Sequence, residues 1–132
     1  MKKRIRTVIP AFLIVSILVG NLLAAQASGV MPRYKGIANF SSGLTISSTG
    51  KATCEGTAMM WDDYTANVTV ELMQDGTTIQ TWTASGSEVI SAGGIYYVKS
   101  GHTYWVTTTV TVYTADGKFV ESHFKDSLPT DY

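Results

Sequence analysis

Two histidines, His102 and His123, could serve as acid–base catalysts near neutral pH. With Asp62 or Asp63 and one of the many serines, either histidine could form a hydrolytic triad. The G-x-S-x-G sequence that holds a nucleophilic serine is missing, and such combinations arise by chance in any β-rich chain. We therefore expect both histidines to be structural and the protein not to be an enzyme.

The single cysteine, Cys54, could be a nucleophile if a histidine lay beside it. It belongs to an alternation in which the small residues Ala52, Cys54, Gly56 and Ala58 are separated by polar ones. This pattern predicts a strand with one closely packed face, on which Cys54 acts as a small buried hydrophobe. With no second cysteine, the chain has no internal disulfide.

Carboxylates could also collect a calcium ion, with Asp62 and Asp63 joined by Glu55 or Glu71. A dedicated calcium loop has spaced Asp or Asn ligands and a glycine, and this sequence lacks that spacing. We expect a solvated loop here, with no metal ion and no other cofactor.

Aromatic residues are the stronger functional signal, because the chain has three Trp and seven Tyr. Exposed aromatic rings can stack on sugar rings. The candidates for such a platform are Trp61 and Tyr64 in a predicted loop, and Trp105 and Tyr113 on the polar face of the longest predicted strand. The alternative is that these rings fill the core or cover a sheet edge.

Three alternating threonines, Thr107, Thr109 and Thr111, raise the possibility of ice binding. A row on one strand is ordinary β-propensity, and ice binding needs a flat array repeated over several strands. The sequence does not predict such an array.

The N-terminal segment has the features of a secretory signal peptide. Lys2, Lys3, Arg4 and Arg6 precede a charge-free run over 8–25, and Ala25-Gln26-Ala27 matches the small-x-small cleavage pattern. The sequence thus predicts a signal peptide over 1–27 of bacterial type. The alternative is a retained membrane anchor, which the polar and proline residues of the run weaken, since a spanning helix needs about 20 apolar residues.

Export changes the charge balance of what remains. The chain has 10 basic and 10 acidic residues, and the signal peptide holds four of the basic ones, which leaves six against ten. This argues against nucleic acid or a membrane surface as a partner. No cysteine comes immediately after the apolar run, where a lipoprotein would carry it, and the terminal Leu-Pro-Thr-Asp-Tyr is not a complete sortase signal. We therefore expect a protein released outside the cell.

The rest of the chain is dominated by β-forming residues with turns about every ten residues, which is typical of an all-β protein. Asp75-Gly76 and Asp116-Gly117 predict hairpin turns. We expect seven to eight strands in an immunoglobulin-like β-sandwich over 36–126, after a lead-in over 28–35 and before a polar tail over 127–132. In the last strand, Phe124 and either Phe119 or Val120 are expected to point inward.

Two resemblances accompany these patterns. Val98, Gly101, Tyr104 and Val106 resemble the tyrosine corner of immunoglobulin and fibronectin type III sandwiches, in which the Tyr hydroxyl bonds back to the main chain. The segments LTISSTGKATC and GHTYWVTTTVTVY resemble a family of small exported all-β proteins of Gram-positive bacteria that has no assigned function. This resemblance implies export and an all-β fold, and it supplies no site residues.

The sequence therefore predicts a secreted, monomeric, non-enzymatic binding or interaction module. Its expected partner is a cell-wall glycan or another extracellular protein. A first alternative is a secreted bacteriocin-like antagonist, although no cationic amphipathic segment suits it for membrane attack. A second alternative is a small secreted hydrolase.

Overall fold

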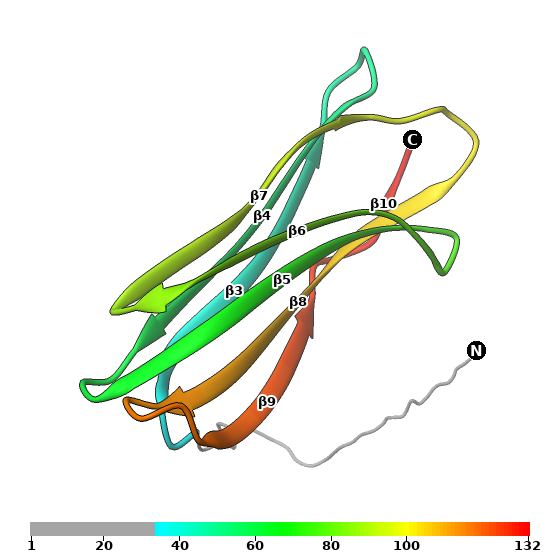
Figure 1. The fold of residues 1–132 in the computed structure, drawn as a ribbon. Helices are drawn as coiled ribbons and strands as arrows, with labels where there is room; N and C mark the ends of the chain where they lie inside the picture. The colour runs from blue at the N-terminus through cyan, green and yellow to red at the C-terminus, as the bar shows by residue number, and fades with distance from the viewer. Residues whose placement is uncertain (1–33) are drawn as a thin grey trace, which may run out of the picture. The chain divides into compact units, whose positions relative to one another are not determined.

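The computed structural model describes residues 34–132, which form an all-β, sandwich-like domain of two antiparallel sheets (Figure 1). One sheet has the order β3 (Ile37–Ile46), β4 (Lys51–Met60), β7 (Val89–Tyr97). The other has the order β10 (Thr130–Asp131), β8 (Thr103–Thr114), β5 (Tyr64–Gln74), β6 (Thr77–Ser87), and β9 (Phe119–Asp126) also pairs with β8. The predicted all-β class and the two antiparallel sheets are confirmed.

Two predictions concern the N-terminal part of the chain. The signal peptide over 1–27 and most of the lead-in over 28–35 lie outside the described residues. Residues 34–132 contain no helix long and apolar enough to cross a membrane.

Both predicted hairpin turns are present. Asp75 and Gly76 join β5 to β6 with φ values of 50° and 91°, a conformation that Asp tolerates and Gly adopts freely. Gly117, with a φ of 88°, lies in the turn between β8 and β9. These turns bring β5 beside β6 and β8 beside β9 in the larger sheet.

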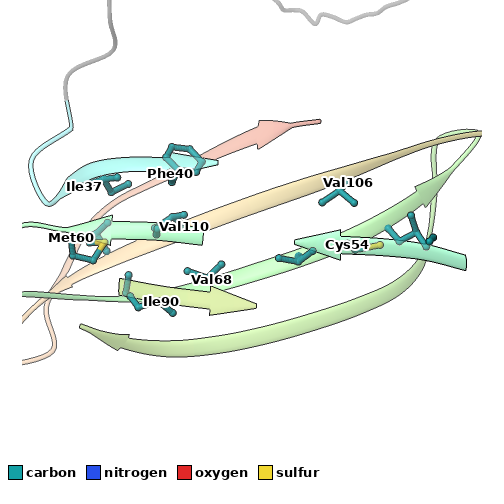
Figure 2. Packing of buried hydrophobic residues seen from close by; sticks show 14 of the residues in the cluster. Ile37, Phe40, Cys54, Met60, Val68, Ile90, Val106 and Val110 are labelled. Atoms are coloured by element: carbon teal, nitrogen blue, oxygen red, sulfur yellow. The ribbon is translucent and has the colours of Figure 1, made fainter. Parts of the chain in front are cut away.

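The small-residue face of β4 lies at the centre of the smaller sheet and points into the core. Its alternate residues are buried, as the sequence predicts: Ala52, Cys54, Gly56, Ala58 and Met60. The facing strands β5 and β8 contribute larger buried side chains. Figure 2 shows Cys54 and Met60 of β4 in the same layer as Val68, Val106 and Val110.

Gly56 lies at a point of close contact between the two sheets. A Cβ atom at Gly56 would lie 2.5 Å from Thr108 Oγ1 and 2.6 Å from a methyl carbon of Val70. Thr108 itself is fully buried, and its hydroxyl donates to Ser42 Oγ at 2.9 Å. The Ser42 hydroxyl in turn donates to the Val106 carbonyl oxygen at 2.9 Å, so a polar chain crosses between the sheets with its groups satisfied.

The corner before β8 has the hydrogen bond that the tyrosine motif implies. Tyr104 is fully buried, and its hydroxyl donates to the Lys99 carbonyl oxygen at 2.6 Å. The bond joins the start of β8 to the loop that leaves β7, and so joins the two sheets at this end.

The inward prediction for Phe124 is wrong. Phe124 and Phe119 are 68% and 64% exposed, whereas Val120 packs against the core. The register pairs His123 with Val110 and Phe124 with Thr109, and an irregularity between Val112 and Tyr113 shifts the start of β9. Directly paired residues point to the same side of a sheet, so His123 takes the inner side and Phe124 the outer.

The last residues are part of the sheet, whereas the sequence predicts a polar tail over 127–132. β10 pairs with Thr103 and Tyr104 of β8, where β9 no longer covers that strand. The Tyr132 hydroxyl donates to the Ser48 carbonyl oxygen at 3.1 Å. The tail orders because it completes hydrogen bonds that the exposed end of β8 would otherwise leave to water.

The Gly56→Val substitution tests the packing between the sheets. We expect it to lower the free energy of unfolding by about 1–3 kcal/mol, since the added methyl groups would overlap Thr108 and Val70. Urea denaturation of the full chain measures this. The matched control is Gly43→Val on the exposed face of the same sheet, where a Cβ meets no atom within 4 Å. Equal effects of the two substitutions would contradict the proposed constraint.

Candidate functional site

The four predicted platform aromatics do not come together. Trp61 is 57% exposed in the turn after β4, but Tyr64 packs partly buried against the core, with its ring beside Gly36. Trp105 and Tyr113 share the outer face of β8, yet eight residues of extended strand separate them by about 26 Å. The structure therefore offers no single platform made of these four residues.

The outer face of the larger sheet instead carries hydroxyls on four neighbouring strands. Thr109 of β8 lies beside Thr69 of β5, and Thr69 lies beside Thr83 of β6. In the next row, Thr111 is flanked by Asn67 on one side and Ser122 on the other. The threonine row is thus not confined to one strand. We call this surface the hydroxyl face: Asn67, Thr69, Thr83, Ser85, Thr109, Thr111 and Ser122.

A shallow depression lies in the hydroxyl face between β5 and β6. Its lining includes the side chains of Asn67, Thr69, Thr83 and Ser85. Within residues 34–132 these four side chains make no hydrogen bond to another protein group. Hydroxyl and amide groups both donate and accept, so the depression offers neutral donors and acceptors to a ligand.

An aromatic edge borders the hydroxyl face on β8 and β9. It consists of Tyr113, Phe119 and Phe124. The rings of Tyr113 and Phe119 meet edge to face with centroids 6.4 Å apart, and Phe124 lies across from Thr109. The sequence predicts Phe124 as an inward residue and leaves either Phe119 or Val120 as the other. The structure places Val120 inward, and the shift in register that turns Phe124 outward is not visible in the alternation of the residues of β9.

His102 forms a polar pair with Asp75 at the far end of β8. Its Nδ1 lies 2.5 Å from Asp75 Oδ2, and the Thr103 N–H donates to Asp75 Oδ1 at 2.9 Å. These two hydrogen bonds, first that from Thr103 and then that from His102, lower the pKa of Asp75. The Thr103 hydroxyl donates to Asp131 at 2.7 Å and not to His102, so this pair is not placed to activate the Thr103 hydroxyl.

His123 lies in a different part of the domain from His102. Its Nε2 lies 3.0 Å from Glu121 Oε1, and its ring packs on Tyr34 with centroids 4.5 Å apart. His123 pairs with Val110, so it lies about 26 Å along the strand from His102. The two histidines do not form a joint site.

The acidic residues considered as calcium ligands do not form a single site either. Asp62 and Asp63 line a depression with Thr114 and Asp116, at the opposite end of β8 from His102. Glu55 lies on the outer side of β4, in the smaller sheet. Within residues 34–132 no group of three or more His, Cys, Asp or Glu side chains is placed to hold a metal ion.

Cys54 is buried and unpaired with a histidine in the described part of the chain. Burial raises the pKa of its thiol to about 11. A thiol with this pKa is almost wholly protonated at neutral pH, and the thiolate is the nucleophilic form. The prediction that Cys54 is a small buried hydrophobe is confirmed.

Comparison with known protein families and with curated proteins finds no match to this chain. The resemblance to a family of exported Gram-positive proteins therefore stays a prediction.

Glu121 should make the stability of the domain depend on pH. Burial raises its pKa, but hydrogen bonds from the Gly36 N–H, His123 and the Lys35 N–H outweigh burial and leave the pKa lowered. A lowered folded-state pKa adds stability above the unfolded-state pKa of about 4.3. That stability is lost as pH falls through the folded-state value.

The Glu121→Gln substitution should lower the free energy of unfolding by about 1 kcal/mol at neutral pH, and the difference from wild type should shrink in acid. Urea denaturation of the full-length wild type and variant, at neutral pH and at acidic pH, measures this difference in the free energy of unfolding. Glu55→Gln is the control, because Glu55 makes no side-chain hydrogen bond within residues 34–132. A difference that persists unchanged in acid would contradict the role assigned to the carboxylate.

Proposed function

We propose that this chain is an exported, non-catalytic binding domain whose hydroxyl face and aromatic edge bind a neutral polysaccharide such as a cell-wall glycan. The observation that carries the proposal is the position of Phe119 and Phe124, both mostly exposed, beside rows of hydroxyls on one sheet face. Sugar rings present apolar C–H faces that stack on aromatic rings and hydroxyls that pair with Thr, Ser and Asn.

The charge of this surface favours a neutral ligand. The rows through Thr109 and Thr111 contain no charged residue, and the nearest acids, Glu71 and Asp126, occupy the next row. No lysine or arginine lies in these rows to neutralise phosphates, which argues against nucleic acid. An uncharged array of donors and acceptors suits a polymer of neutral sugars.

The same proposal includes the finer fold type. We assign the sandwich to the immunoglobulin-like class, with β3, β4 and β7 in one sheet and β5, β8 and β9 in the other. The hydrogen bond from Tyr104 to Lys99 supports this assignment, since the tyrosine corner occupies the same point of such sandwiches. β6 extends the sheet of β5, β8 and β9 and so widens the hydroxyl face.

Pull-down on insoluble polysaccharides tests the function. The full chain is incubated with cellulose, chitin, β-glucan and peptidoglycan, and bound protein is measured against concentration. We expect binding to at least one of these polymers, and we expect Phe119→Ala/Phe124→Ala to weaken it by about tenfold or more, since aromatic contacts dominate such interfaces. Thr109→Val, which removes a hydroxyl and keeps the shape, should weaken it by about three- to tenfold.

Met59→Ala is the control for these variants. Met59 is 48% exposed on the outer face of the smaller sheet, and its substitution should leave binding unchanged. Failure of the wild type to bind any of the four polymers would overturn the proposal. Binding that the double Phe substitution does not reduce would overturn the assignment of the surface.

A further inference from the structure

The two long sides of the sandwich differ in how their edge strands are protected. On the side of β3 and β9, the inward positions of β9 hold charged or titratable groups: Glu121, His123 and Lys125. Lys125 Nζ donates to the Phe40 carbonyl oxygen of β3 at 2.8 Å and lies 4.6 Å from the centre of the Phe40 ring. Inward-pointing charges on an edge strand oppose pairing with another chain. The side of β3 and β9 is therefore protected against pairing with a further strand.

The side of β6 and β7 has no such protection. From Thr77 to Val98 the sequence holds a single charged residue, Glu88, in the short link between the two strands. Within residues 34–132, β7 pairs with β4 alone, and its other edge has no strand partner. β7 spans nine residues without charge or proline. A long, uncharged edge of this kind is a template for a further strand.

Exposed apolar side chains distinguish β7 from β6. Val89, Ile95 and Tyr97 are 60%, 52% and 68% exposed on the outer side of β7. The exposed residues of β6 are threonines, serines and a glycine, which water solvates well. A partner strand beside β7 would remove apolar surface from water, and one beside β6 would remove little.

We propose that β7 pairs antiparallel with β7 of a second copy of this chain, about a two-fold axis. Full overlap of the nine residues places the axis at Gly93, the midpoint of β7. Val89 then lies opposite Tyr97 of the partner subunit, and Ser91 lies opposite Ile95 of the partner subunit. An aromatic residue across from a β-branched one is a favourable cross-strand pair.

A second copy is the occupant because the edge is complementary to itself. Two-fold pairing of an uncharged strand brings no like charges together. It also gives hydrogen-bond partners to the free backbone N–H and C=O groups of β7 in both copies at once. The three-stranded sheets of the two copies would join into one sheet of six strands. This dimer replaces the monomer that the sequence predicts. It leaves both hydroxyl faces free, because those belong to the other sheet, and it presents two equivalent binding surfaces to a polymer.

Sedimentation equilibrium of the full chain over a range of concentrations tests the pairing. We expect a dimer for the wild type. The Ser91→Lys/Ile95→Lys substitution should weaken association by about tenfold or more, because it sets lysines directly opposite each other across the axis. The Ser91→Lys/Ile95→Glu substitution should restore association, since opposite charges then face one another.

The matched control is Thr81→Lys/Ser85→Lys, which adds two lysines at the same spacing to exposed positions of β6. This control should remain dimeric. Circular dichroism of each variant shows whether it folds, and charge reversal gives a readout that misfolding cannot mimic. A wild type that stays monomeric at all concentrations would overturn the proposal, as would a dimer broken equally by the β6 control or not rescued by the opposite-charge pair.

Discussion

The close approach of β4 to the larger sheet is the constraint on which the rest of the structure depends. Gly56 leaves no space for a side chain, because Thr108 and Val70 occupy it. The hydroxyls of buried Thr108 and partly buried Ser42 form their hydrogen bonds in this arrangement. Sliding either strand by one residue would bury its polar face and break these bonds. The register, and therefore the composition of each outer face, follows from this contact.

With this register, the surfaces of the domain differ in composition and in how their edge strands are protected. On the outer face of the larger sheet, the rows through Thr109 and Thr111 are uncharged and rich in hydroxyls, and Phe119 and Phe124 border them. One side is closed by the inward groups of β9, while the other ends in the uncharged strand β7. The proposed binding face and the proposed pairing edge do not compete, since they belong to different sheets.

Much of the fold could be read from local patterns. The alternation around Cys54, the turn at Asp75-Gly76 and the corner at Tyr104 all appear where the sequence predicts them, because each depends on a few adjacent residues. The site was less predictable. Phe124 points outward because an irregularity in the pairing of β9 shifts its register, and no local signal marks that irregularity. The sequence predicts Tyr64 in a loop, whereas in the structure it begins β5. Its side chain lies inward because it continues the alternation of buried residues along that strand.

The sequence by itself determined which residues share one side of a strand, since side chains alternate with a period of two along any extended segment. It also determined that the only cysteine has no disulfide partner. Only the tertiary structure decided which strands are neighbours. Thr109 meets both Thr69 and Phe124 through pairings between segments far apart in the chain. Such pairings depend on how whole faces pack against each other, and so the hydroxyl face and the open edge of β7 exist only in the folded domain.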